Sequence, residues 1–181
     1  MKIDNNIGKL KYPIGEFESP QFITQQNLQN YISDLENFPD RLKSLVKDFS
    51  KEQLNTPYRP GGWTVKQTVH HIADSSMNAY IRFKLALTEE TPVIKPYFEA
   101  RWAELPDYND AEIETSIELL KHLHKRWGQL LRGLTEKDFG KRFFHPEFDK
   151  EYSLKETAAM YSWHCRHHYA HIDELRKRMN W

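Results

Sequence analysis

Residues 161–171 hold four histidines whose spacing suits metal binding. At about 100° per residue in an α-helix, His164, His168 and His171 fall within a sector of roughly 60°. Apolar residues such as Leu175 share this sector, so the histidines are predicted to face a protein interior. Two histidines at i and i+4 have Cβ atoms about 6 Å apart, close enough for both imidazoles to bind one ion. The pattern therefore indicates a metal-binding helix.

These histidines have two competing interpretations. An isolated buried histidine usually packs in the core and hydrogen-bonds to a carbonyl or carboxylate. Several histidines on one apolar stripe favour a metal, because each imidazole would otherwise need its own buried partner, whereas one cation satisfies several. Zinc sites that perform chemistry usually have three protein ligands and one open position, and bundles draw ligands from facing helices. A third ligand is therefore expected on another helix.

Residues 69–74 offer two candidates for that ligand, His70 and His71. Neither lies on the main apolar stripe of its segment, so periodicity does not choose between them. His71 shares a polar ridge with four residues that either line an internal cavity or form a solvated face: Thr68, Ser75, Asn78 and Arg82. The pattern slightly favours the solvated face, because lone arginines are usually solvated.

Four long amphipathic segments must position the histidines. The first spans residues 22–48, where Pro39 either starts a second helix or kinks a long one. The second follows a capping box at Thr64 and runs to about residue 88, and the third covers roughly residues 109–134. The fourth begins at Ser153 and continues towards the C-terminus. The predicted fold is therefore an all-α four-helix bundle.

The connecting segments are short. Residues 57–62, 91–106 and 141–152 read as linkers, and Ser50 with Gln53 predicts a short helical turn. The aromatic residues of 142–152 predict a small hairpin or ordered loop between the third and fourth helices. Residues 1–20 are expected to form an extended N-terminal segment. A chain of 181 residues suits one domain, covering residues 1–181.

Composition excludes several partners. Lysine plus arginine and aspartate plus glutamate both number 26, so no net field favours nucleic acid or an anionic membrane. Apolar runs are only a few residues long and the N-terminus does not resemble a signal peptide, which predicts a cytoplasmic protein. Cys165 is the one cysteine, so no intramolecular disulfide forms, and a small packed side chain is expected there.

Several motifs together resemble one known family. They are the segments 12–17, 58–75, 78–92 and 161–172, beginning Tyr-Pro-Ile-Gly-Glu-Phe, Tyr-Arg-Pro-Gly-Gly-Trp, Asn-Ala-Tyr-Ile-Arg-Phe and Tyr-Ser-Trp-His. This combination resembles the YfiT-type metal-dependent hydrolases of the DinB-like, bacillithiol-transferase-like superfamily. The resemblance covers nearly the whole chain. It implies a four-helix bundle, a cytoplasmic homodimer, and one divalent metal ion per subunit, usually zinc, with nickel as an alternative.

The resemblance also implies which residues bind the metal. The first ligand is the histidine eight positions after the motif tryptophan, which selects His71 rather than His70. The other two are His164 and His168. His171 stands where many relatives carry glutamine, so the resemblance implies an orienting or substrate-facing role for it. The His-Arg-Gly-Gln sequence of the wider superfamily is absent, which favours the YfiT branch over the thiol transferases.

Three functions remain open from the sequence. The first is a hydrolase in which the metal activates water against a small molecule. Two catalytic roles are then considered: Asp74 orients His71, with a surface charge as the alternative, and His171 accepts a proton, with packing as the alternative. The second function is a transferase that activates a low-molecular-weight thiol. The third is a non-enzymatic structural or sensing site, favoured if His171 were a fourth ligand.

Overall fold

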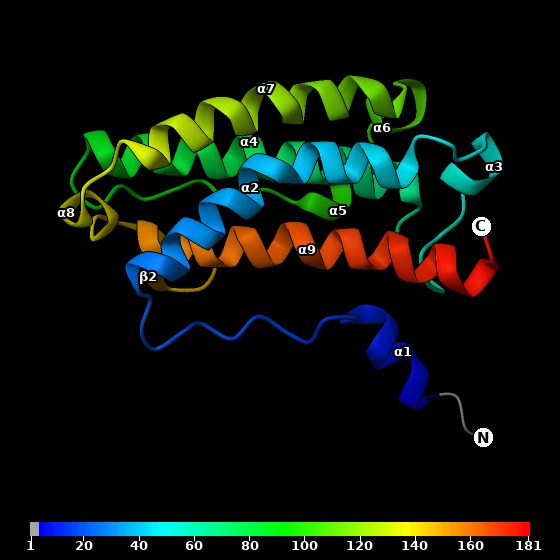
Figure 1. Ribbon diagram of the computed structural model, residues 1–181, viewed down its shortest axis with the longest axis horizontal. Coiled ribbons are helices and arrows are strands. Elements are labelled where there is room, and N and C mark those ends of the chain that lie inside the picture. Colours follow the sequence, from blue (N-terminus) through cyan, green and yellow to red (C-terminus); the bar gives the residue numbers. More distant parts are fainter. Residues whose placement is uncertain (1–3) are drawn as a thin grey trace.

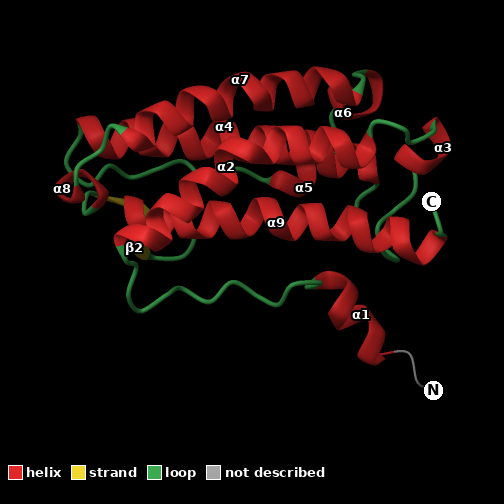
Figure 2. Cartoon of the chain, viewed as in Figure 1, coloured by secondary structure: helices red, strands yellow, loops and turns green. Residues whose placement is uncertain are grey.

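The computed structural model describes residues 4–181. Four long helices make up most of this structure (Figure 1). They are α2 (Gln25–Val46), α4 (Val65–Thr88), α7 (Ile113–Arg132) and α9 (Leu154–Met179). Helices α2 and α4 each pack against both α7 and α9. Figure 2 shows that helix dominates and that strand is confined to a small part of the chain. The predicted all-α four-helix bundle is therefore confirmed.

Side-chain caps fix where the bundle helices begin. Thr64 accepts a hydrogen bond from the backbone N–H of Gln67, and Ser153 accepts one from the backbone N–H of Glu156. In both capping boxes the long side chain returns to the backbone N–H of the cap residue. The starts of α4 and α9 and the end of α4 at Thr88 match the sequence prediction. Because these caps fix where α4 and α9 begin, they also fix the positions of the histidines along the bundle axis.

Helix α2 is continuous, with Pro39 inside it. A proline has no N–H to donate, so it leaves the carbonyl four residues earlier without its helical partner. That carbonyl belongs to Leu35, and it accepts a hydrogen bond of 2.6 Å from Nδ1 of His124 on α7. The neighbouring helix therefore supplies the donor that proline removes.

Shorter elements connect and cover the bundle. They are α1 (Asp4–Lys11), α3 (Lys51–Leu54), α5 (Glu99–Trp102), α6 (Pro106–Asp110), α8 (Glu136–Phe139), β1 (Arg142–His145) and β2 (Lys150–Ser153). The strands pair antiparallel, which confirms the predicted hairpin. Helix α7 begins at Ile113 rather than near residue 109, because α6 ends first and the backbone is extended at Ala111 and Glu112.

The N-terminal segment differs from its prediction. Residues 1–3 of the expected extended segment lie outside the described residues, but α1 shows that residues 4–11 are helical. Lys9 and Lys11 occupy its last turn, where positive charge stabilises a helix. Residues 12–24 contain no helix or strand and run beside α9 (Figure 1). The ring centroid of Phe17 lies 5.7 Å from that of Trp163 on α9.

The hairpin holds a loop against the bundle. The backbone N–H of Phe144 donates to the carbonyl of Pro92, and the N–H of Ile94 donates to the carbonyl of Phe144. Ile94 and Phe143 are buried in the hydrophobic core. The segment after residue 91 is therefore an ordered wall rather than a free linker.

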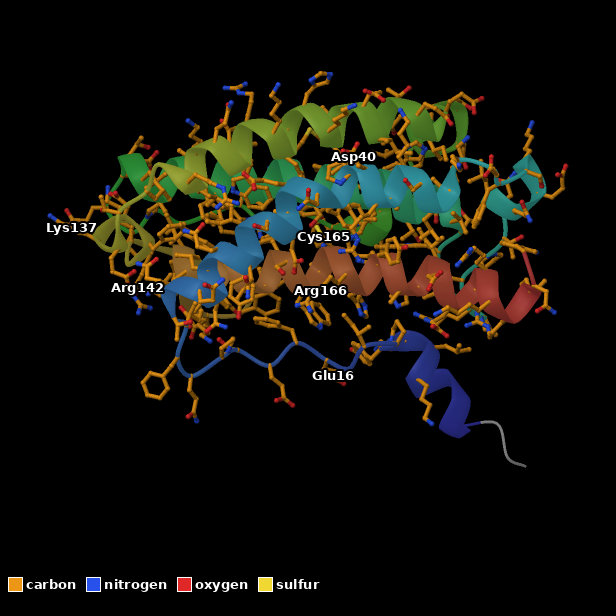
Figure 3. All side chains as sticks on the ribbon, in the orientation of Figure 1. Glu16, Asp40, Lys137, Arg142, Cys165 and Arg166 are labelled. Atoms are coloured by element: carbon orange, nitrogen blue, oxygen red, sulfur yellow. The ribbon has the colours of Figure 1, made fainter. Side chains whose placement is uncertain are left out.

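Polar and apolar side chains separate as expected for a bundle. Cys165 is fully buried and packs as a small apolar residue, whereas its neighbour Arg166 is exposed and lies 3.5 Å from Asp34 (Figure 3). Burial raises the pKa of the Cys165 thiol, which therefore stays protonated. None of the described helices combines the length and the apolarity needed to cross a membrane.

Candidate metal centre

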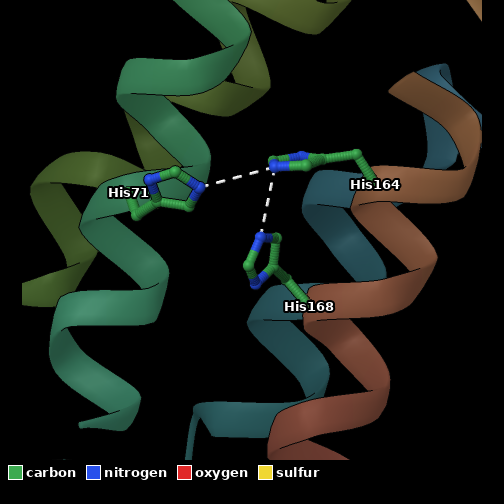
Figure 4. A group of neighbouring side chains, drawn as sticks. All are labelled: His71, His164 and His168. Carbon is green, nitrogen blue, oxygen red and sulfur yellow. Dashed lines mark hydrogen bonds between the residues drawn. The ribbon is translucent and has the colours of Figure 1, made fainter. Parts of the chain in front are cut away.

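Helices α4 and α9 bring three histidines together. His71 lies in the second turn of α4, and His164 and His168 lie one turn apart on α9. Figure 4 shows their ring nitrogens turned towards a common point between the two helices. The possible ligand atoms of the three residues all lie within 4.8 Å of one another. Histidines 93 positions apart in sequence therefore meet in the fold.

The distances between the ring nitrogens match a metal site. Nε2 of His164 lies 3.4 Å from Nε2 of His71 and 3.1 Å from Nε2 of His168. Tetrahedral zinc with Zn–N bonds of about 2.05 Å would place neighbouring nitrogens about 3.3 Å apart. The two separations from His164 are close to that value, and the possible ligand atoms of His71 and His168 lie within 4.8 Å of each other.

Burial keeps these imidazoles neutral. It lowers the pKa of His71 to about 4 and that of His164 to about 3, and it also lowers the pKa of His168, with neighbouring histidines adding to the effect for the α9 pair. A neutral imidazole offers one unprotonated nitrogen as a metal ligand. At neutral pH all three residues are therefore in the state that binds a metal.

The donor set fits a divalent ion better than it fits a packed core. Nδ1 of His71 and Nδ1 of His168 are buried and have no hydrogen-bond partner among the described residues. The Nε2 atoms face one another instead of facing carbonyls or carboxylates. One cation would bind all three Nε2 lone pairs, whereas the histidines satisfy one another only if an imidazole donates its Nε2–H to a neighbour. Among the described residues the cluster has three members, which leaves one position of a tetrahedral ion open.

An aromatic wall fixes the rings. The Trp63 ring centroid lies 4.5 Å from that of His71 and 6.4 Å from that of His168. Trp63 follows a tight turn in which Gly61 has φ +67°, a conformation that favours glycine. Packing against a large ring limits the rotation of both imidazoles, so the turn before α4 orients the site.

The histidines open onto a cavity of about 420 Å³. Its walls come from α4, α9, the N-terminal segment, the loop before α5 and the hairpin. The lining residues include Phe17, Trp63, His71, Ser75, Arg82, Tyr97, Glu99, His145, Glu147, Phe148, Tyr161, Trp163, His164 and His168. This volume suits a small molecule.

Most of the polar ridge of α4 is buried, and His71, Ser75 and Arg82 line this cavity, so the slightly favoured solvated interpretation is wrong for them. Asn78 is half-buried, and its amide donates to the carbonyl of Asp74. Thr68, His71, Ser75 and Arg82 are all buried. Arg82 donates a hydrogen bond of 3.2 Å from a guanidinium nitrogen to the hydroxyl of Tyr161. The loop after residue 91 and the hairpin cover the ridge, and neither shows in the periodicity of α4.

Asp74 does not orient His71. Its carboxylate accepts a hydrogen bond of 2.6 Å from the hydroxyl of Tyr108, while Nδ1 of His71 has no partner among the described residues. Burial raises the pKa of Asp74, and the bond from Tyr108 opposes that rise. The hypothesis fails because one helical turn carries Asp74 towards α6 rather than towards the His71 ring.

His171 lies beside the cavity lining rather than in it. Its Nε2 donates to the carbonyl of Lys11 at 3.0 Å, and its ring stacks on Tyr58 with centroids 4.0 Å apart. It is absent from the metal-ligand cluster, and its ring centroid lies 5.4 Å from that of His168. Its described contacts tie α9 to the N-terminal segment.

His70 also stays outside the cluster. Its Nδ1 lies 2.7 Å from the hydroxyl oxygen of Ser116 on α7. The structure therefore separates two adjacent histidines that periodicity could not separate: His71 faces α9 and His70 faces α7.

Two residues of the cavity lining, Tyr97 and His145, were not predicted from the sequence. Both come from the irregular loop and the hairpin, where hydrophobic periodicity carries no information about which side chains face inward. The one available signal for His145 was its place among aromatic residues in a predicted hairpin. Burial, with Arg82 nearby, lowers the pKa of His145.

Comparisons with known proteins identify the family. The family model of the DinB superfamily matches residues 34–172. Proteins of Bacillus cereus (strain 03BB102) and Bacillus thuringiensis subsp. konkukian (strain 97-27), both named "Putative metal-dependent hydrolase", are 51% identical over 172 residues. Those alignments cover 95% of this chain and 98% of each relative.

Solved structures show the same architecture. YfiT from Bacillus subtilis, described as "a probable metal-dependent hydrolase with an unusual four-helix bundle topology", has a TM-score of 0.94 and 49% identity, covering 96% of this chain and 99% of that one. A mycothiol-dependent maleylpyruvate isomerase shares the fold at a TM-score of 0.62 and 16% identity, covering 82% of this chain and 60% of the isomerase. The chain therefore belongs to the DinB superfamily, in the group that includes YfiT.

Proposed function

We propose that this protein is a metal-dependent hydrolase that binds one divalent ion through His71, His164 and His168 and cleaves a small molecule. The observation that carries the proposal is the convergence of three imidazole Nε2 atoms, two from buried histidines and one from the half-buried His164, at the wall of a cavity. The names of the relatives from Bacillus support the same assignment.

The three histidines suit a Lewis-acid role. A divalent ion held by neutral ligands keeps its full charge, which polarises a carbonyl or phosphoryl oxygen and makes water a stronger acid. The cluster contains no carboxylate or thiolate that would reduce this charge. We propose zinc as the ion, because three histidines with one open position are typical of zinc enzymes, with nickel as the alternative.

Other residues of the cavity lining are placed to contact the substrate. Trp63 and Trp163 flank the histidines and exclude water from part of the cavity. The hydroxyl of Tyr161 remains protonated, because burial raises its pKa, so it is a hydrogen-bond donor. His145 is neutral and its Nδ1 has no hydrogen-bond partner among the described residues. We propose that His145, rather than His171, is the cavity histidine that contacts the substrate, because His171 donates to the carbonyl of Lys11.

The homodimer and the cytoplasmic location are carried over from the family, and the expected lack of nucleic-acid and membrane binding comes from the balanced charge. We propose a homodimer, a cytoplasmic location and no role in binding nucleic acid or membranes. Sedimentation of the purified protein measures the oligomeric state directly. A monomer at micromolar concentration would contradict the homodimer without affecting the assignment of the metal ligands.

The first experiment is elemental analysis of the purified protein. We expect about one metal ion per chain in the wild type and near-complete loss in the His71→Ala, His164→Ala and His168→Ala variants. Two control variants should keep the metal: His122→Ala, because His122 is exposed on α7, and His70→Ala, because His70 contacts Ser116 instead.

Two results would redirect the proposal. Loss of the metal in His171→Ala would indicate a closed four-ligand site with a structural or sensing role. A wild-type protein that stays metal-free after zinc or nickel is supplied would contradict the proposal. Once the metal is established, incubating candidate electrophiles and esters with and without a low-molecular-weight thiol separates hydrolysis from thiol transfer, because only transfer consumes the thiol.

A further inference from the structure

Arg82 is a buried cation with no acidic partner in the described structure. Only 8% of its surface is exposed. Among the side chains that the structure describes, no carboxylate lies within 4.0 Å of its guanidinium, and its hydrogen bond goes to the neutral hydroxyl of Tyr161. The eight ion pairs of the same residues do not include it.

A buried guanidinium without a counterion is stabilised when it binds an anion. A guanidinium carries five N–H donors and does not lose its proton in proteins. Burying it without a counterion is costly, and charged residues are rarely buried unless they are paired. Because Arg82 lines the cavity, a bound molecule can supply the missing charge.

The surroundings of Arg82 favour one negative charge. Ser75, Tyr97 and Tyr161 line the same region as neutral hydroxyl groups, and burial raises the pKa of both tyrosines. The acidic residues of the cavity lining, Glu99 and Glu147, are exposed. One cation balances one carboxylate, whereas a doubly charged phosphate would leave an excess negative charge facing these two glutamates.

Arg82 and the histidines lie along one cavity. His71, Ser75 and Arg82 stand at i, i+4 and i+11 on α4, so they occupy one side of the helix. The Cα atoms of His71 and Arg82 are about 16 Å apart along the axis, but helical side chains lean towards the N-terminus, which brings the guanidinium back towards His71. On α9, Tyr161 contacts Arg82, and its ring centroid lies 5.7 Å from that of His164.

We propose that Arg82 is the anion-binding residue of this cavity and that the substrate is a small molecule with a carboxylate group. The guanidinium binds that carboxylate in a bidentate manner, while the bond to be cleaved lies at the three histidines. Trp63, Trp163 and Phe17 contact the apolar part between the two ends. The identification of the substrate rests on the proposed hydrolase function. The binding of an anion by Arg82 can be tested without it.

The test compares benzoate with benzamide, which has nearly the same shape and no charge. Ligand-observed NMR titrations are made with metal-loaded protein and with chelator-treated protein, because a carboxylate can also bind the metal itself. In chelator-treated protein Arg82 is the remaining cationic partner in the described cavity lining. Inorganic phosphate is titrated in parallel.

The variants are Arg82→Met, Arg82→Lys and the control Lys84→Met, which removes one positive charge from the exposed face of the same helix. We expect both wild-type preparations to bind benzoate more tightly than benzamide and phosphate. Arg82→Met should weaken benzoate binding by about tenfold to a hundredfold and leave benzamide binding unchanged. Arg82→Lys should retain part of the affinity, because it keeps the charge but loses the planar fork. Lys84→Met should behave as wild type.

Circular dichroism and metal content are measured for each variant, and Arg82→Lys supplies the answer if Arg82→Met does not fold. Equal binding of benzoate and benzamide to the wild type, or full benzoate binding by folded Arg82→Met, would overturn the inference. Tighter binding of phosphate than benzoate would overturn the choice of a carboxylate. If the wild type cannot be loaded with zinc or nickel but still binds benzoate through Arg82, the hydrolase proposal fails and the anion site stands.

Discussion

His124 and the three clustered histidines are all imidazoles inside the bundle, buried except for the half-buried His164, yet their ring nitrogens have opposite kinds of partner. Nδ1 of His124 donates to the carbonyl of Leu35, and Nε2 lies 3.0 Å from the hydroxyl oxygen of Ser76, which can donate to it. Both nitrogens therefore have protein partners. In the cluster, the Nε2 atoms face one another, and Nδ1 of both His71 and His168 lacks a partner among the described residues.

The difference teaches how to separate a structural histidine from a ligand histidine. Burial does not separate them, because it lowers the pKa of both His124 and His71 to about 4. The hydrogen-bond partners available to the ring nitrogens do separate the two kinds of histidine. A structural histidine completes hydrogen bonds that the fold has left open, whereas a ligand histidine keeps a lone pair that the fold does not satisfy.

The largest expected effect is stabilisation by metal. Zinc at a hundred times its dissociation constant should raise the free energy of unfolding of the wild type by about 2.7 kcal/mol, because the ion binds the folded state. The His164→Ala variant should gain almost nothing at the same concentration. Thermal unfolding with and without zinc measures both values. Equal stabilisation of the two proteins would remove the distinction between the cluster and His124.

The next effect is structural and concerns His124. We expect His124→Ala to lower the free energy of unfolding by about 2 kcal/mol, because a buried carbonyl and hydroxyl lose their partner, and to leave zinc affinity unchanged. In a Pro39→Ala background the same change should cost less, since the substituted residue would supply the helical N–H to the carbonyl of Leu35. Urea unfolding of the four proteins gives this coupling, and strict additivity would contradict the role assigned to His124.

A smaller effect should appear in the pH dependence of metal-free protein. The folded-state pKa of His124 is about 4, below its ordinary value of 6.5. As pH falls below about 6.5 the unfolded chain binds a proton that the folded chain does not, so stability decreases until about pH 4. His124→Gln should reduce the loss between pH 6.5 and 5.5 by about 1 kcal/mol. Identical pH profiles for the two proteins would show that His124 titrates normally.

The smallest effect is expected at Asp74. Because its carboxylate bonds to Tyr108 and not to His71, Asp74→Asn should leave zinc affinity within about twofold. Its effect on the free energy of unfolding should stay below about 1 kcal/mol, as for a typical single hydrogen bond. A loss of zinc affinity of about tenfold or more would show that Asp74 does orient His71, contrary to the contacts described above.

The bundle followed from the sequence because its signals are local. Capping boxes at Thr64 and Ser153 and the apolar periodicity specify where α4 and α9 begin, and the i, i+4 spacing pairs His164 with His168. The choice of His71 over His70 came from family resemblance and not from periodicity. The structure brings His71 to the other two histidines, and their role as metal ligands stays a prediction.

Contacts between distant segments were outside the reach of the sequence. The polar ridge containing Arg82 looked solvated because its covering comes from a loop after residue 91 and a hairpin near residue 144. Helix α1 was missed because residues 4–11 show no clear apolar face. Asp74 was misassigned because spacing on one helix does not show which neighbouring helix a side chain meets.

The separation of 93 residues between His71 and His164 has a consequence for the order of assembly. The pair on α9 can form as soon as that helix forms, but two imidazoles on one exposed helix hold an ion weakly. The full set exists only after α4 and α9 have docked, which requires most of the chain to be synthesised. Metal is therefore expected to enter a chain that has already folded. The ion then stabilises the finished bundle and does not initiate its folding.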